Sequence, residues 1–183
     1  MKFVKTKLDG VYVIEPNIFE DERGEFIKTF HKDTFIKNGL NVDFKESYYS
    51  ISKKNVLRGM HFQTPPQDYS KLVYVTSGSI IDVVLDIRKG SPTYGKYTQV
   101  ELSDRNGKSI YIQAGFAHGF LSLEDDTCVI YAQTAMYSPE NDSGIRADSF
   151  GFNWPVDKYI ISKRDQNFVD FKNYASLFVY SKK

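Results

Sequence analysis

Short runs of β-branched and aromatic residues, each bounded by turn-forming residues, recur along the chain and constrain its fold more than any other feature. Residues 72–87 predict two strands separated at Ser77-Gly78-Ser79. Strands of this length, with turn signals about every eight to twelve residues, are typical of a β-sandwich or barrel. In the second strand the side chains alternate with a period of two: Ile81, Val83, Leu85 and Ile87 on one face, and Asp82, Val84 and Asp86 on the other.

Three further segments carry strand patterns. Residues 97–102 and 109–112 flank Asn106-Gly107, and Asn-Gly is the strongest short signal for a β-hairpin. Helix signals are few: residues 33–37 predict one short helix, ended by Asn38-Gly39. Residues 127–137 alternate again and predict a strand with Val129, Tyr131, Gln133 and Tyr137 on one face.

These patterns predict an all-β fold with short flanking helices. We expect residues 1–183 to form one domain, because this length is enough to bury a hydrophobic core. Closing the sheets into a jelly roll would remove exposed strand edges. The mouth of such a barrel is a common binding site for small ligands. The 13 Tyr and 14 Phe fit the same fold, because aromatic side chains pack well on half-buried sheet surfaces.

The charge balance limits the possible partners. With 24 basic and 23 acidic residues the net charge is +1, so there is no general attraction to nucleic acid or to an anionic membrane. The single cysteine, Cys128, excludes an internal disulfide and suits a reducing compartment. No apolar run approaches the roughly 20 residues that span a bilayer. From these features we expect a cytoplasmic protein.

Of the three histidines, His61 is the strongest candidate for a functional residue. It lies in the strand-like segment 57–63, close to Arg58 and, across a Pro-Pro loop, to Lys71. A lone histidine in such a segment is more often a hydrogen-bonded core residue than a catalytic one. However, two cations that converge on a pair of strands are costly to bury without an anion. A bound phosphate or diphosphate would satisfy them.

The other two histidines are less informative. His31 lies in a polar stretch and is expected at the surface. His118 lies between Gly115 and Gly119, which indicates either a close approach of the backbone to a ligand or a tight turn at a barrel corner. A metal site usually needs three or four convergent ligands, and the sequence has no His-x-His pair. The sequence therefore predicts neither a metal nor another cofactor.

The chain resembles the dTDP-4-dehydrorhamnose 3,5-epimerase family of cupins. Each matching stretch is weak alone, but together, in this order and spacing, they are highly specific. They are Asp21-Glu22-Arg23-Gly24, the run from Ser52 to Gln63, Lys71-Leu72-Val73, Asp86-Ile87-Arg88, the run from Ser91 to Gly95, the run from Gly115 to Phe120, Tyr137-Ser138-Pro139, and Ser162-Lys163-Arg164-Asp165.

The resemblance implies a cupin jelly roll that forms a homodimer, needs no metal and moves protons on the carbons beside the ketone of a nucleotide-linked 4-keto-6-deoxy sugar. It implies that His61 is the general base, that Asp165 is its partner, and that Tyr131 is the acid on the opposite face. Lys71 would stabilise the enolate. The implied substrate-binding residues are Arg23 and Arg58 at the diphosphate, His118 lining the pocket, and Gln63 and Tyr137.

The chain departs from the family pattern at positions that the resemblance places near the nucleotide or sugar. Where the family usually has Gln-Asp-Asn-His, this chain has Glu46-Ser47-Tyr48-Tyr49, and Lys28 stands where many members have glutamate. A tyrosine that usually precedes Tyr137 is replaced by Met136. Lys28, Glu46 and Tyr48 are therefore predicted to contact the substrate and to alter its identity. A lysine could hydrogen-bond a guanine carbonyl, so relatives that act on GDP-linked 4-keto-6-deoxyheptoses are a candidate group. Drift at tolerant positions is the alternative.

Three other functions compete with epimerisation. A cupin ketoisomerase would shift the carbonyl of a similar sugar nucleotide, but the matches at Tyr131 and Asp165 argue against it. A metal-dependent cupin oxygenase would require bound iron. A non-catalytic binding module would not need His61, Lys71 and Tyr131 together. The product of the predicted epimerase would enter lipopolysaccharide, capsule or a secondary metabolite.

Overall fold

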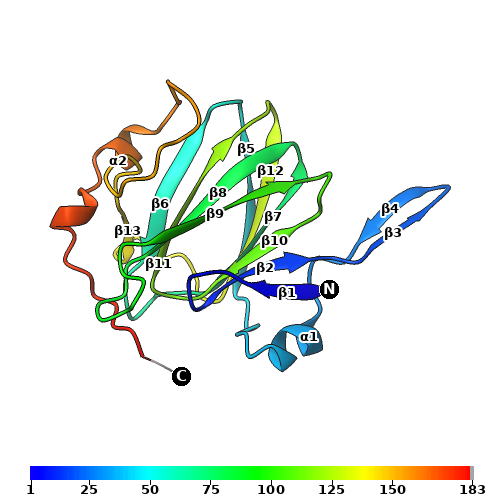
Figure 1. The fold of residues 1–183 in the computed structure, drawn as a ribbon, viewed down its shortest axis with the longest axis horizontal. Coiled ribbons are helices and arrows are strands. Elements are labelled where there is room, and N and C mark those ends of the chain that lie inside the picture. The colour runs from blue at the N-terminus through cyan, green and yellow to red at the C-terminus, as the bar shows by residue number, and fades with distance from the viewer. Residues whose placement is uncertain (182–183) are drawn as a thin grey trace.

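The computed structural model describes residues 1–181 and is built from two facing antiparallel sheets and one separate hairpin (Figure 1). The six-stranded sheet has the order β1 (Lys2–Lys5), β2 (Val11–Glu15), β10 (Ser109–Ile112), β7 (Lys71–Ser77), β12 (Thr127–Gln133) and β5 (Glu46–Ser52). The five-stranded sheet has the order β13 (Asp142–Gly144), β6 (Leu57–Gln63), β11 (Phe116–Ser122), β8 (Ser79–Asp86) and β9 (Tyr97–Ser103). The hairpin pairs β3 (Ile18–Asp21) with β4 (Gly24–Ile27). This is the jelly roll that the strand pattern predicts.

Alternation along the strands builds the core between the sheets. Val73 of β7 and Val129 of β12 face Val84 of β8 and Phe120 of β11, and each of these side chains is at most 1 % exposed. Burial of each such side chain contributes about 1.5–3 kcal/mol. The apolar residues fill one part of the space between the sheets. Polar residues at the same inward-facing positions, such as Lys71 and His118, continue this space into a pocket.

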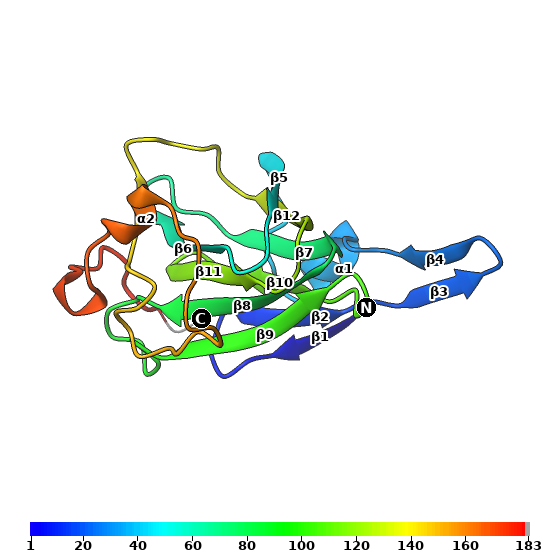
Figure 2. The same cartoon turned by 90° about the horizontal axis from the view of Figure 1, so that it is seen from above.

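The outer face of each sheet is also covered. The segment after β13 runs along the outside of the five-stranded sheet, where Phe152, Trp154 and Phe178 pack on it (Figure 2). Helix α1 (Lys32–Lys37) buries Phe35 fully against Tyr111 on the six-stranded sheet. Most of the buried aromatic residues therefore pack on sheet surfaces, as expected from the high content of Tyr and Phe. In residues 1–181 no helix is long and apolar enough to cross a membrane.

The structure corrects one strand prediction. β9 and β10 do not form a hairpin: β9 pairs with β8, and β10 pairs with β2 and β7 in the other sheet. The Asn106-Gly107 turn does form, since the Asn106 side chain accepts the backbone N–H groups of Ser103 and Lys108. The turn carries the chain from one sheet to the other, because β10 is buried along its whole length between β2 and β7.

The remaining local predictions hold with small changes of length. The break at Gly78 separates β7 from β8. The predicted helix is α1, and Gly39 after it has φ +74°, a left-handed conformation that favours glycine. His31 is exposed at the start of α1, as expected. β12 ends at Gln133, so Tyr137 lies in the following loop rather than on the strand.

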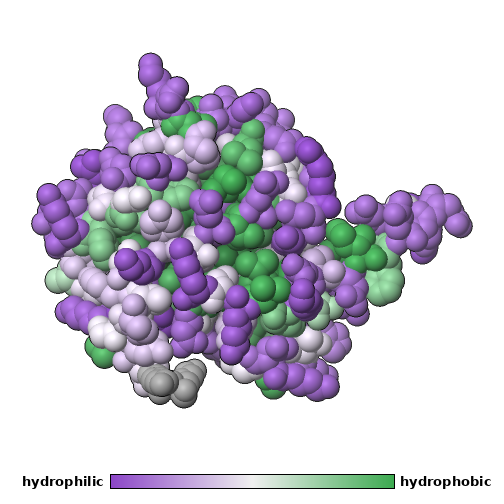
Figure 3. All heavy atoms as spheres, viewed as in Figure 1, coloured by the Kyte–Doolittle hydropathy of each residue, from purple (hydrophilic) through white to green (hydrophobic). Residues whose placement is uncertain are grey.

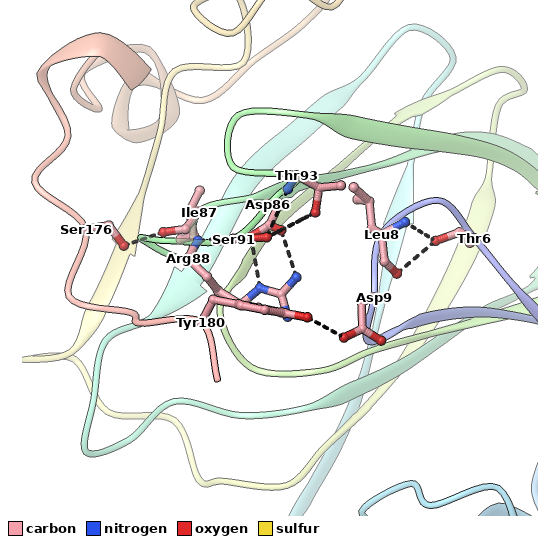
Figure 4. Close-up of polar contacts among 10 residues, drawn as sticks. All are labelled: Thr6, Leu8, Asp9, Asp86, Ile87, Arg88, Ser91, Thr93, Ser176 and Tyr180. Carbon is pink, nitrogen blue, oxygen red and sulfur yellow. Dashed lines mark hydrogen bonds and ion pairs between the residues drawn. The ribbon is translucent and has the colours of Figure 1, made fainter. Parts of the chain in front are cut away.

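The end of the chain is anchored to the body by polar contacts (Figure 4). The Ser176 hydroxyl donates to the backbone carbonyl of Ile87, and the Tyr180 hydroxyl lies 3.1 Å from Asp9 Oδ2. The Arg88 guanidinium lies over the Tyr180 ring and forms a buried ion pair with Asp86. This anchoring holds the C-terminal segment, which carries helix α2 (Lys163–Gln166), against the five-stranded sheet.

The β3–β4 hairpin projects away from the two sheets (Figure 1). Ile18, Phe19 and Phe26 are 42 %, 60 % and 61 % exposed, and Figure 3 shows hydrophobic residues where the hairpin leaves the body and hydrophilic residues further out. Arg23 lies in the turn at its far end, where it pairs with Asp21. Phe19 and Phe26 lie against each other, with 6.5 Å between their ring centroids, and both remain largely exposed.

Candidate active site

The candidate site lies between the two sheets, at the polar end of the space that they enclose. A pocket of 190 Å³ is lined by residues from both sheets: Tyr48 and Ser50 of β5, Arg58 and His61 of β6, Tyr69, Lys71 of β7, His118 and Phe120 of β11, and Tyr131 of β12. The predicted base, acid and enolate-stabilising cation therefore meet in one pocket, and so do the two cations that the sequence placed near one another.

His61 is paired with Asp165, a residue more than a hundred positions away in the chain. His61 Nε2 lies 2.9 Å from Asp165 Oδ2. The contact is off the line of a well-aligned hydrogen bond, and the same oxygen also accepts the backbone N–H of Gly59 at 3.1 Å. The Ser162 hydroxyl accepts the Asp165 backbone N–H and so caps α2. This arrangement orients the imidazole.

Neighbouring groups stabilise the negative charge of Asp165. Burial of this side chain works to raise the pKa of Asp165, but contacts with His61, the Gly59 backbone and Ser162 outweigh it and lower the pKa. The carboxylate therefore stays ionised at neutral pH, although the side chain is only 4 % exposed. An ionised partner holds the His61 ring in place.

Lys71 and Tyr131 enter the pocket from the six-stranded sheet. Burial lowers the pKa of Lys71 to about 8, against attraction from Asp82 and Asp142. The Lys71 ammonium also lies 5.0 Å from the centroid of the Tyr69 ring. Burial raises the pKa of Tyr131, so its hydroxyl keeps its proton until a strong base forms nearby. The Tyr131 hydroxyl lies 3.2 Å from Ser50 Oγ.

A second pocket of 280 Å³ adjoins the first and shares Tyr48, His61 and Tyr69 with it. Here the Glu46 carboxylate accepts the backbone N–H of Tyr137 at 2.6 Å. The other lining residues are Gln63, Gln133, Asp142 and Arg164. Burial raises the pKa of Tyr48 to about 12, which keeps this tyrosine neutral. Four predicted substrate-binding residues, Glu46, Tyr48, Gln63 and Tyr137, thus lie around the pocket that adjoins the one with His61 and Tyr131.

Two predicted substrate-binding residues lie outside these pockets. Arg23 is at the far end of the projecting hairpin, and Lys28 is exposed just after β4. The glycine beside His118 serves packing between strands: a Cβ on Gly119 would lie 2.7 Å from the Arg58 carbonyl oxygen and 3.0 Å from Gly59 Cα. This close approach of β6 and β11 makes His118 the direct partner of His61 in the sheet.

Several pocket residues were missed by the sequence analysis. Ser50 and Gln133 lie two positions from Tyr48 and Tyr131 on the same strands, so the period of two could have found them. Tyr69 precedes Lys71 in an irregular loop and carries no such signal. Asp142 and Arg164, which contact each other at 3.0 Å, come from segments that only the fold brings together. Within residues 1–181 no group of three or more His, Cys, Asp or Glu side chains could hold a metal ion.

Comparison with known proteins shows the family of this chain. The model of the dTDP-4-dehydrorhamnose 3,5-epimerase family matches residues 5–173. A protein of that name from Methanothermobacter thermautotrophicus is 49 % identical over 172 residues, which cover 91 % of this chain and 92 % of the relative.

Solved structures show the same fold. The dTDP-6-deoxy-D-glucose-3,5-epimerase of Legionella pneumophila, in complex with dTDP-4-keto-L-rhamnose, superposes with a TM-score of 0.94 at 34 % identity and covers 99 % of both chains. A 3'-monoepimerase from Streptomyces bikiniensis, in complex with dTDP-quinovose, has a TM-score of 0.88 at 29 % identity, covering 91 % of this chain and 86 % of the other. This chain belongs to the dTDP-4-dehydrorhamnose 3,5-epimerase family, the epimerases of nucleotide-linked 4-keto-6-deoxy sugars.

Proposed function

We propose that this chain inverts carbon 3, carbon 5 or both in a nucleoside-diphosphate 4-keto-6-deoxy sugar, with His61 as base and Tyr131 as acid. One observation carries the assignment: His61 on β6 and Tyr131 on β12 line the same pocket from the two facing sheets. A sugar ring held between them would lose a proton to one side and regain it from the other. Opposite faces give inversion, whereas a single base would return the proton to the face that it left.

The neighbouring groups fit the intermediate of this reaction. A hydrogen beside a ketone is acidic because the resulting enolate carries its charge on oxygen. The Lys71 ammonium at that oxygen would stabilise the charge as it forms, which is worth roughly 3–4 kcal/mol for a well-placed donor. Asp165 keeps the protonated His61 stable until the proton leaves. The reaction needs no redox step, because the number of protons and electrons on the sugar is unchanged.

The diphosphate and the projecting hairpin point to a homodimer. Arg58 lines the catalytic pocket, but Arg23 of the same chain lies at the far end of the hairpin. In the proposed dimer, the hairpin of each copy packs Phe19 and Phe26 on the other copy and brings its Arg23 to that copy's pocket. Burying these exposed aromatic side chains would stabilise the dimer, and the second arginine would complete the diphosphate site.

The identity of the nucleotide depends on residues that depart from the family pattern. The relatives named above are dTDP-sugar enzymes, which supports dTDP as one candidate. Glu46 and Tyr48 line the second pocket in this chain, and Lys28 follows the proposed exchanged hairpin. These positions support a GDP-linked hexose or heptose as the other candidate, and it is the one that we expect to be preferred. We place the reaction in the cytoplasm, where the free Cys128 would stay reduced, and in the supply of sugars for lipopolysaccharide or capsule.

The decisive experiment uses the purified protein with dTDP- and GDP-linked 4-keto-6-deoxy sugars in deuterated water, followed by NMR. We expect deuterium at carbon 3 or carbon 5, together with inverted configuration at that carbon. Movement of the carbonyl along the ring would identify a ketoisomerase instead. Consumption of oxygen that depends on added iron would identify an oxygenase. Binding of the nucleotide sugar without any exchange would identify a binding module.

A further inference from the structure

Asp82 of β8 is a charged residue in the interior that the proposed reaction does not use. Its side chain is fully buried, and it points into the space between the sheets beside Phe120, its partner on β11. Asp82 Oδ2 lies 2.7 Å from His118 Nε2. Within residues 1–181, Oδ1 is buried without any hydrogen-bond partner. A buried carboxylate with an unpaired oxygen is costly unless a positive charge compensates it.

His118 does not provide that positive charge. It is 3 % exposed, and burial together with the positive charge of Lys71 lowers the pKa of His118, although Asp82 acts in the opposite direction. The neutral imidazole therefore donates its Nε2–H to Asp82, and the negative charge stays on the carboxylate. Lys71, 5 % exposed, is the buried cation of the same pocket, and it forms no ion pair within residues 1–181. Within residues 1–181, neither Asp82 nor Lys71 has a cation or anion of the opposite sign within ion-pair distance, since His118 is neutral.

The other charged groups around Lys71 already have partners of their own. Asp142, from β13, contacts Arg164 at 3.0 Å, and Asp165, from α2, contacts His61. The Glu46 carboxylate on β5 accepts the backbone N–H of Tyr137. The remaining titratable groups that face the pocket are Arg58 on β6, and the neutral tyrosines Tyr48, Tyr69 and Tyr131. Asp82 is thus the carboxylate whose charge is available to Lys71.

We propose that Asp82 is a positioning residue that keeps Lys71 protonated in the resting enzyme and fixes the His118 ring beside His61. The inference rests on the proposed role of Lys71 as the cation that stabilises the enolate. Formation of the enolate brings a further negative charge to Lys71, in addition to those of Asp82 and the more weakly acting Asp142. The ammonium is held charged for the moment at which the enolate forms, without a carboxylate bound to it directly.

The proposal predicts how the reaction rate depends on pH. Lys71 is useful while it is protonated, and this form is lost as the pH rises through its pKa of about 8. Asp82 raises this pKa against the effect of burial, so removal of the carboxylate lowers it further. The alkaline limb of the rate profile should then move to lower pH. A residue with only a structural role would reduce stability or rate without moving this limb.

The test compares Asp82→Asn with Asp86→Asn. Asp86 is equally buried on the same strand, but it binds Arg88, Ser91 and Thr93 away from the pocket (Figure 4). The pKa of Lys71 is measured without substrate, by the pH dependence of its acetylation by acetic anhydride, read by peptide mass spectrometry. The rate of deuterium exchange into the sugar is measured over the same pH range.

We expect Asp82→Asn to lower the pKa of Lys71 and the alkaline limb together by about one pH unit or more, whereas Asp86→Asn leaves both in place. An unchanged Lys71 pKa in folded Asp82→Asn would overturn the proposal. His118→Asn keeps the carboxylate, so it should hold the Lys71 pKa at or above that of wild type, and a decrease would also overturn the proposal. If wild type exchanges no deuterium into any sugar, the proposed function fails, while the acetylation data still decide the role of Asp82.

Discussion

The ring of Tyr48 stacks on the ring of Tyr131, with 4.7 Å between their centroids and 19° between their planes. Tyr48 is 42 % exposed and lines both pockets, so it forms a wall that holds the proposed acid in place. An aromatic ring thus supports the proposed acid in this chain.

Tyr48→Ala should reduce the rate of inversion more than the rate of exchange. A stacked aromatic pair contributes about 0.5–1.5 kcal/mol, so we expect inversion to slow by up to about tenfold. The rate of deuterium exchange, which His61 starts, should fall less, because the stack supports Tyr131 and not His61. Tyr49→Ala is the control, since Tyr49 is 66 % exposed on the other face of β5. Equal losses of inversion and exchange would show that Tyr48 binds the substrate rather than holding Tyr131.

His61→Asn should stop deuterium exchange at every carbon that the wild type exchanges. The loss of a general base reduces the rate by about 10²–10⁴-fold. The control is His31→Asn, an exposed histidine at the start of α1, which should exchange at the wild-type rate. Circular dichroism of the variant checks that it is folded. Wild-type exchange in a folded His61→Asn protein would exclude His61 as the base.

Tyr131→Phe should separate the acid from the base. The variant keeps the ring on Tyr48 but loses the hydroxyl near Ser50, so His61 can still form the enolate. We expect deuterium to enter the substrate while little inverted product appears, at least at one carbon. Tyr111→Phe, whose hydroxyl donates to the Asn41 carbonyl outside the pocket, should invert normally. If exchange and inversion fall equally, the hydroxyl is required for the enolate itself.

The proposed exchange of hairpins predicts that two inactive variants restore activity when mixed. Arg23→Ala removes the exchanged arginine, and His61→Asn removes the base. A mixed dimer has one pocket with an intact His61 and an intact Arg23 from its partner. Refolding the two variants together should recover about a quarter of wild-type activity if subunits assort at random into C2 dimers. No recovery, with mixed dimers shown by mass spectrometry, would place Arg23 and His61 of one site on the same chain.

The nucleotide preference is tested by the ratio of kcat/KM for GDP- and dTDP-linked forms of one 4-keto sugar. We expect GDP to be preferred, because a site built to hydrogen-bond one base leaves groups unpaired with another, at a cost of about 1–3 kcal/mol for each. Lys28→Glu should narrow or reverse the preference, and Lys37→Glu on α1 should not. A wild-type preference for dTDP of about tenfold, which is 1.4 kcal/mol, would show that the departures at Lys28, Glu46 and Tyr48 are drift.

The sequence by itself determined the local parts of the fold. The alternation that predicts β7, β8 and β12 follows from strand geometry, because successive side chains point to opposite faces whatever the partner. Helix α1 and its end at Gly39 are likewise set by a few neighbouring residues. The resemblance carried by the segments around His61, His118 and Asp165 also predicted which residues of one pocket belong together, since the motif order encodes a fold already known.

Tertiary structure alone decided which strands pair. The Asn106-Gly107 turn forms as expected, but the gain in burial for β9 in one sheet and β10 in the other outweighs the local preference for a hairpin. The same distant packing brings Asp82 beside His118, Tyr48 onto Tyr131 and Arg164 to Asp142. These contacts form only when the two sheets close around a common core. They join residues that are far apart in the sequence, so no short stretch of sequence predicts them.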